Sequence, residues 1–121
     1  MYHHIYLIFP CIATVFAANH DILVGQSGLS FTPETTVAAV GDTLTFHFFP
    51  RHHSVVRGPY ETPCSYSTAA NDTFFSGFIP STSGAASQTF TVTVKDTKPM
   101  WYYCSQASHC QLGMAGVVNP P

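Results

Sequence analysis

The chain has 121 residues, of which 8% are charged, 45% are hydrophobic and 14% are aromatic. This length suits one domain, and the apolar and aromatic content indicates a packed core rather than a disordered chain. The net charge is −2 with histidine neutral, and the four basic residues are scattered, so the sequence offers no basic surface for nucleic acid.

The first segment differs from the rest. Residues 5–18 are almost wholly apolar and end in small residues, and Pro10 interrupts the run. A transmembrane helix is the alternative, but it needs about 20 apolar residues. We therefore predict a signal peptide over residues 1–17, cleaved after Val15-Phe16-Ala17, although no Lys or Arg precedes the run. The mature domain would span residues 18–121, would be extracellular and would have no membrane span.

Short apolar or alternating segments separated by turn residues follow, and each predicts a strand. In one of them Leu44, Phe46 and Phe48 share a face, and in another Phe90, Val92 and Val94 do. The region 59–87 is rich in Pro, Gly and Ser and predicts an irregular segment with at most one short helix. We predict an all-β fold: a two-sheet, antiparallel Greek-key β-sandwich of seven to eight strands. The predicted strands include 21–25, 36–40, 43–48, 53–56, 88–94, 99–104 and 113–118.

Two further features fit a secreted protein. The sequon Asn71-Asp72-Thr73 predicts N-glycosylation of Asn71 on a surface loop. Cleavage of the signal would remove Cys11 and leave Cys64, Cys104 and Cys110. Because three cysteines cannot all pair within one chain, we expect one disulfide and one free thiol, which a metal ion would hold. A Cys64–Cys104 disulfide, with Cys110 free, is one of the possible pairings.

One segment gathers candidate metal ligands. Cys104, His109 and Met114 place a thiolate, an imidazole and a thioether between two predicted strands. Soft sulfur with imidazole selects copper, and a trigonal His₂Cys set with a weak axial Met is the blue-copper arrangement. The second histidine must come from elsewhere, and His53, which opens a short strand after the bend at Pro50, is the candidate.

Other histidines compete with His53. Neighbouring strand residues point to opposite faces, so only one of His52 and His53 can face the loop. His47 falls on the polar face of its strand and is expected to be a surface residue. His20 would suit a copper oxygenase only if cleavage followed Asn19, which the small-residue rule disfavours.

Zinc is the alternative metal, bound by His53, Cys104, His109 and Cys110, but the spacing lacks the close cysteine pairs of a structural zinc site. The sequence shows no paired carboxylates at a useful spacing, no nucleophile elbow and no phosphate loop. A copper ion with four protein ligands has no open position for substrate, so we expect no enzyme.

The motifs resemble those of a known family. His53-Ser54-Val55-Val56 resembles the His-(Asn/Ser)-Val signature of cupredoxins, and Cys104-x₄-His109-x₄-Met114 is similar to the copper loop of phytocyanins. Gly41-Asp42-Thr43-Leu44 and the segment 98–104 resemble the fungal extracellular serine-rich cupredoxin-like proteins.

The resemblance implies a monomeric one-electron carrier with an unknown redox partner. Copper would be bound by His53, Cys104, His109 and Met114, and the edge of the His109 ring would be the electron port. Cys110 would pair with Cys64 and leave Cys104 for copper.

Two expectations stay open beside this one. Members of the fungal group often carry a Ser-rich tail and a lipid anchor, and the sequence ends at Asn119-Pro120-Pro121 with neither. We therefore expect either a free soluble domain or a truncated gene model. Attachment to the wall or the membrane stays open. The alternative function is an extracellular or cell-wall structural or interaction domain in which copper is incidental.

Overall fold

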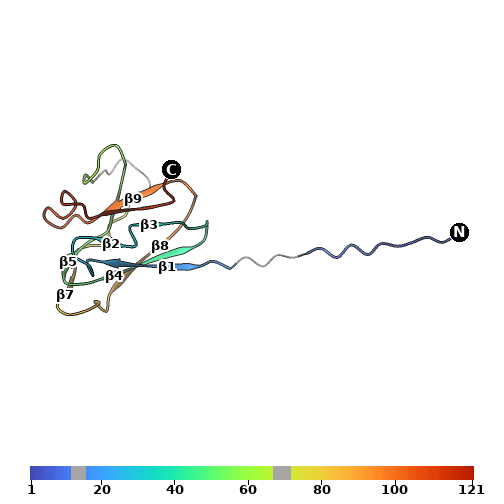
Figure 1. The fold of residues 1–121 in the computed structure, drawn as a ribbon, viewed down its shortest axis with the longest axis horizontal. Helices are drawn as coiled ribbons and strands as arrows, with labels where there is room; N and C mark the ends of the chain where they lie inside the picture. Colours follow the sequence, from blue (N-terminus) through green and yellow to red (C-terminus); the bar gives the residue numbers. More distant parts are fainter. Residues whose placement is uncertain (12–15, 67–71) are drawn as a thin grey trace.

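A computed structural model describes residues 1–11, 16–66 and 72–121 (Figure 1). Two predicted features lie outside the described residues: the glycosylation site Asn71, and Val15 of the cleavage motif. The described residues contain strands and no α-helix. The strands are β1 (Asn19–Val24), β2 (Phe31–Thr32), β3 (Thr35–Thr36), β4 (Thr43–Phe48), β5 (Arg51–His53), β6 (Val56–Gly58), β7 (Ile79–Ser81), β8 (Thr89–Thr93), β9 (Met100–Tyr103) and β10 (Ala115–Val118).

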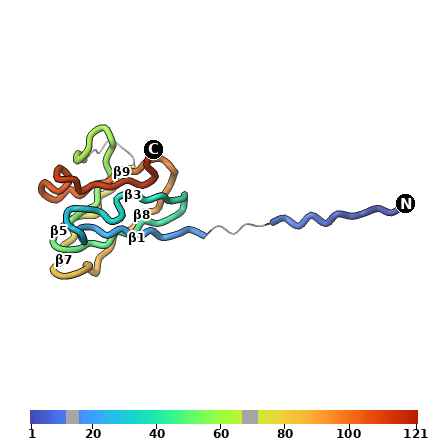
Figure 2. The backbone as a smooth tube through the Cα atoms, in the orientation of Figure 1, coloured from blue at the N-terminus to red at the C-terminus, as the bar shows by residue number. Residues whose placement is uncertain are grey.

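The strands form two main layers and a small third sheet. The first layer has the order β2-β1-β4-β8, the second has the order β3-β10-β9-β6, and β5 pairs with β7. Side chains of both layers meet in one hydrophobic core. The prediction of an all-β two-sheet sandwich is thereby confirmed, and the chain path through its layers can be followed in Figure 2.

The expectation of an antiparallel sandwich is wrong at two strand pairs. β1 runs parallel to β4 over six residue pairs, and β3 runs parallel to β10. Parallel neighbours need a crossover connection. The chain provides one because it leaves the first layer after β2, contributes β3 to the second layer, and then returns as β4.

Two predicted strands have different bounds because the chain changes sheets within them. The strand expected over 36–40 overlaps β3 at Thr36 alone, and Val37 and Val40 are exposed in the return to β4. The strand expected over 53–56 is divided: β5 pairs with β7, whereas β6 pairs with β9. Ser54 and Val55 lie between them, so the chain changes sheets there, and His53 ends a strand instead of opening one.

Alternation on β4 builds the centre of the core, as the sequence predicts. Leu44, Phe46 and Phe48 are fully buried. Phe46 meets the ring of Tyr102 from the other layer at 5.3 Å and that of Phe31 at 6.4 Å, both edge-to-face. Such aromatic pairs add to the hydrophobic stabilisation that burial provides, so Phe46 joins the two layers.

The described residues before Ala18 lie away from the sandwich. Residues 1–11 and 16–18 are exposed and form no strand, and Figure 1 shows the segment extending away from the layers. Among the described residues, no helix is long and apolar enough to cross a membrane.

Replacing Phe46 by alanine tests the role of this ring in joining the layers. We expect Phe46→Ala to lower the free energy of unfolding by about 3–5 kcal/mol, because it removes a buried ring and leaves a cavity. Phe78 is 53% exposed, so Phe78→Ala is the matched control and should cost about 1 kcal/mol or less. Guanidinium unfolding monitored by fluorescence measures both, and equal losses would contradict a core centred on Phe46.

Candidate metal centre

Three predicted ligands converge at one end of the sandwich. Cys104 follows β9, His109 lies in the loop that leads to β10, and His53 ends β5. One donor atom from each of these residues lies within 4.8 Å of the others. Cys104 Sγ is 3.9 Å from His53 Nδ1 and 3.5 Å from His109 Nδ1. Cys104 and His53 are buried, and His109 is partly exposed.

These distances fit one transition-metal ion between the three donors. Metal bonds of about 2.3 Å to sulfur and about 2.0 Å to nitrogen, opening at about 120°, place the two donors about 3.7 Å apart. The two observed separations, 3.5 Å and 3.9 Å, lie on either side of that value. A thiolate with two imidazoles is a donor set that suits copper. The residues therefore fit the metal that the sequence predicts.

A backbone contact orients the His53 ring. We assign the proton to Nε2, which then donates to the Pro50 carbonyl at 3.0 Å. That leaves the lone pair of Nδ1 directed toward Cys104. Burial lowers the pKa of His53, and although the Pro50 contact acts in the opposite direction, the net shift favours the neutral ring that a metal requires.

Gly25 packs against the same ring. A Cβ atom at this position would lie 2.3 Å from His53 Nε2, and the backbone φ is +78°. Only glycine meets both conditions without strain, because it has no Cβ and adopts positive φ freely. No local pattern in the sequence predicts this contact, since Gly25 falls at the end of the strand expected over 21–25.

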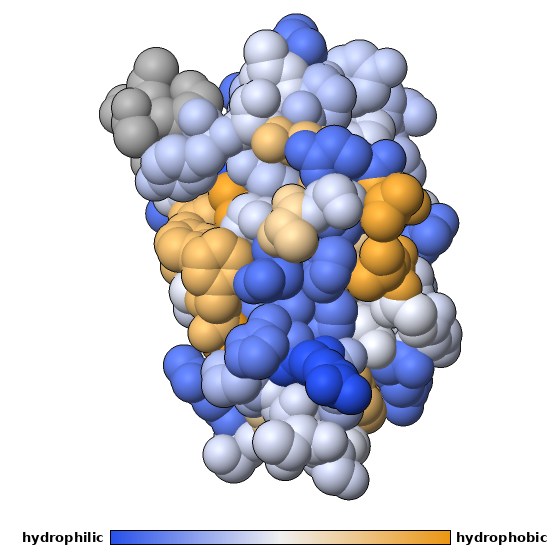
Figure 3. All heavy atoms as spheres, turned by 90° about the vertical axis from the view of Figure 1, so that its left-hand side faces the viewer, coloured by the Kyte–Doolittle hydropathy of each residue, from blue (hydrophilic) through white to orange (hydrophobic). Residues whose placement is uncertain are grey.

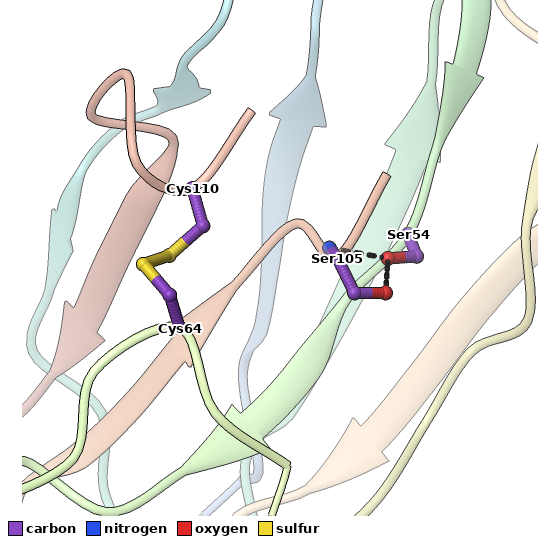
Figure 4. The surroundings of a disulfide bond; sticks show 4 residues. All are labelled: Ser54, Cys64, Ser105 and Cys110. Atoms are coloured by element: carbon purple, nitrogen blue, oxygen red, sulfur yellow. Dashed lines mark hydrogen bonds between the residues drawn. A yellow bond between two sulfur atoms is a disulfide. The ribbon is translucent and has the colours of Figure 1, made fainter. Parts of the chain in front are cut away.

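Ser54 ties the His53 segment to the loop that carries Cys104 (Figure 4). Its Oγ accepts a hydrogen bond from Ser105 N at 2.8 Å and lies 2.7 Å from Ser105 Oγ. Its backbone N–H donates to Cys104 Sγ at 3.4 Å. Hydrogen bonds to a ligand sulfur help to set the electronic properties of a metal centre. The sequence predicts Ser54 only as part of the His-(Asn/Ser)-Val signature, and it gives no indication of the contact with Ser105.

Backbone hydrogen bonds close the loop between β9 and β10. Met114 N donates to the His109 carbonyl at 3.0 Å, and Cys104 N donates to the Met114 carbonyl at 3.1 Å. These bonds bring the three sequence positions together at the base of the loop. Met114 is fully buried.

A disulfide restrains the same loop. Cys64 and Cys110 are bonded, and Cys110 directly follows His109 (Figure 4). Cys104 is a buried free thiol. Since Cys110 is used in the disulfide, it is not available to a zinc ion in this structure.

The competing histidines lie elsewhere. His47 Nε2 is 2.8 Å from Asp21 Oδ1, and His20 Nε2 is 2.9 Å from Asp42 Oδ2. His52 is exposed on β5, on the opposite side of the strand from His53. The structure brings none of the three into the cluster around Cys104.

A β-sandwich with a His-Cys-His cluster at one end defines a cupredoxin-like domain, and sequence comparison agrees. The sequence model of the plastocyanin-like domain family matches residues 26–114, most of the chain. The chain belongs to this plastocyanin-like, cupredoxin family. The resemblance seen in the motifs is thereby confirmed.

Two relatives come from the fungus Arthroderma benhamiae. An extracellular serine-rich protein is 42% identical over 111 residues, which are 91% of this chain and 43% of the relative. A probable GPI-anchored cupredoxin is 33% identical over 106 residues, which are 87% of this chain and 53% of the relative. The chain spans about half the length of the curated relatives it matches.

Solved structures share the fold at low sequence identity. A purple cupredoxin from Nitrosopumilus maritimus aligns with a TM-score of 0.61 at 16% identity, covering 82% of this chain and 96% of that one. A dithionite-reduced auracyanin from Roseiflexus castenholzii aligns with a TM-score of 0.57 at 17% identity, covering 87% of this chain and 97% of that one. At such identity the likeness shows the fold alone.

The contact between Gly25 and His53 predicts a specific defect in metal binding. In Gly25→Ala the new methyl group must displace the His53 ring, so we expect copper(II) affinity to fall about tenfold or more. Gly28→Ala is a matched control: its φ is +84°, but nothing lies within 4 Å of the added Cβ. Both variants carry a similar backbone cost, and calorimetric titration with copper(II) separates the two effects. Equal affinities would show that Gly25 does not support the site.

Proposed function

We propose that the mature domain is a secreted type 1 copper protein that carries single electrons. Copper would be bound by His53, Cys104, His109 and Met114. The observation that supports this most directly is the buried Cys104 thiol facing two imidazole nitrogens, at 3.5 Å and 3.9 Å, beside a disulfide that uses the other two cysteines of the mature chain.

Copper suits this donor set better than zinc. A structural zinc site takes four Cys or His ligands, whereas the cluster among the described residues has three such donors. A blue-copper site takes three strong ligands and one weak, long thioether, and we assign that fourth position to Met114, which is buried and follows His109 in the same loop. Bound copper would supply a couple that exchanges one electron between Cu(I) and Cu(II).

The protein's part is to hold the ligands in nearly one geometry. His53 is fixed by Pro50 and Gly25, and Cys104 is fixed by Ser54. Ligands that cannot move far give a small reorganisation on electron transfer, which favours a fast exchange. The disulfide at Cys110 restrains the segment that carries His109 in the same way.

His109 is the proposed route for the electron. It is partly exposed, whereas His53 and Cys104 are buried. Figure 3 faces the end of the sandwich that carries β5, β7 and the loop between β9 and β10. On that face, apolar groups lie beside a polar band. A redox partner of unknown identity would dock there against a monomer of this chain.

Location and lack of catalysis complete the proposal. A disulfide persists in an oxidising compartment, and the relatives are named as extracellular or GPI-anchored proteins. A signal peptide over residues 1–17 would direct the chain there. With four protein ligands the proposed site leaves no position for substrate, so we propose no enzymatic reaction.

Removing the thiol should abolish the copper chromophore. With copper(II) added, the wild-type domain should show an intense visible band from charge transfer between the Cys104 thiolate and copper, and Cys104→Ser should lack it. The double variant Cys64→Ser/Cys110→Ser is the control, because it loses two cysteines and keeps this thiol; we expect lower stability but a retained band. A wild-type protein without the band would favour the structural or interaction domain, with copper incidental.

The axial position is tested by the reduction potential. We expect Met114→Gln to keep the visible band and to lower the potential, because an amide oxygen is a harder ligand than a thioether and favours Cu(II). Leu112→Gln makes the same kind of change at a residue of the same loop that is 68% exposed, and should leave the potential unchanged. Protein-film voltammetry measures both, and an unchanged potential in Met114→Gln would exclude Met114 as a ligand.

A further inference from the structure

A buried carboxylate lies where the extended N-terminal segment meets the sandwich. Asp42, in the turn before β4, is 6% exposed. Its Oδ1 accepts a hydrogen bond from Ala18 N at 2.9 Å, and its Oδ2 accepts one from Ala39 N at 2.9 Å. His20 Nε2 lies 2.9 Å from Oδ2. The Asp42 carboxylate therefore gathers donors from two separate segments of the chain.

Ala18 is the first residue that the sandwich holds. Its carbonyl accepts a hydrogen bond from Thr43 N at 3.0 Å, which continues the pairing of Asn19 with Thr43 by one residue. Residues 16 and 17 are exposed and lie outside any strand. The boundary between unpaired and paired backbone thus falls between Ala17 and Ala18, which is also where the small-residue rule places signal cleavage.

We propose that Asp42 is a binding site for the α-ammonium group that proteolytic maturation creates on Ala18. A signal peptidase would break the Ala17–Ala18 peptide bond with one water molecule. The leader would leave with the new carboxylate of Ala17, and the new amine of Ala18 would take up a proton at neutral pH. This ammonium would then lie where the peptide N–H lies, 2.9 Å from Asp42 Oδ1.

Only one cleavage position fits this arrangement. Cleavage before Ala17 would leave the amine one residue, or about 3.3 Å along the strand direction, beyond the carboxylate. Cleavage before Asn19 would remove the donor to Oδ1 altogether. Cleavage before Ala18 puts a positive charge on the donor, so the hydrogen bond to the ionised Asp42 carboxylate becomes an ion pair as well.

Few other charged groups lie near the Asp42 carboxylate and the Ala18 amine. On β1, His20 contacts the carboxylate. The turn residues Ala39 and Gly41 carry no titratable group. The chain after β8 meets Asp42 through the backbone of Val94, and the next residues, Lys95 and Asp96, are exposed and make no hydrogen bond with Asp42 in the part of the chain that the structure describes.

The carboxylate is already suited to a cation. Three hydrogen bonds lower the pKa of Asp42 to about 2. The bond with His20 has the largest effect, and the backbone N–H groups of Ala18 and Ala39 add to it. Asp42 is therefore ionised throughout the pH range in which an α-amine titrates. The site lies at the start of β4, and the metal cluster lies beyond its other end, so this inference does not depend on copper.

Two measurements test the proposal on the chain secreted from a eukaryotic host with its own leader. Mass spectrometry of the N-terminus should give Ala18 as the first residue. NMR titration should give the Ala18 amine a pKa one pH unit or more above its ordinary value of about 7.7–8.0, because a carboxylate lies beside it. A different first residue, or an amine with its ordinary pKa, would overturn the proposal.

A second test measures how the stability of variants depends on pH. An amine whose pKa is raised by folding adds stability that is complete below about pH 8 and is lost as pH rises through the folded-state pKa. A chain that starts at Ala17 should therefore melt at a lower temperature than the mature chain at pH 7, and the gap should close by about pH 11. Asp42→Asn should return the Ala18 amine to its ordinary pKa, whereas Glu61→Gln, at an exposed residue, should not. A gap that does not change with pH would show a structural effect of the added residue instead of an ion pair.

Discussion

Ser54 makes the contact on which the metal centre depends. It lies where the chain changes from the small sheet to the second layer, directly after His53. Its backbone N–H donates to Cys104 Sγ and its Oγ accepts from Ser105 N, so the segment that carries one ligand is bonded to the segment that carries another. Without this junction, His53 and the loop after β9 would be positioned by separate sheets, and fewer contacts would fix the separation of the two ligands.

Sequence periodicity predicts the interior well and the connections poorly. The alternation of Leu44, Phe46 and Phe48 identifies a half-buried strand because burial on one face is a local property of the sequence. The parallel pairing of β1 with β4 depends on a crossover through another layer, which no local pattern records. For the same reason the strand expected over 53–56 proved to be two, paired with different partners.

The candidate site shows the same division. Spacing alone places a thiol, an imidazole and a thioether in one loop, and their chemistry predicts copper. The Cys64–Cys110 pairing was implied only by resemblance, because spacing leaves several pairings open. Gly25 could not be found at all: its importance comes from a ring that is distant in sequence and packs where a Cβ would lie. Supporting residues of this kind are set by close packing between segments, which a single sequence does not display.

Strand β1 links the two ends of the domain. Its register with β4 runs from Asn19–Thr43 to Val24–Phe48, a length of about 20 Å. Ala18, held by Asp42, precedes the first pair, and Gly25, which supports His53, follows the last. A slip of one residue would turn Ile22 and Val24 out of the core and would move Gly25 away from the His53 ring. The anchored start of the strand and its buried side chains therefore fix the same register, and that register places the glycine on which the orientation of a metal ligand depends.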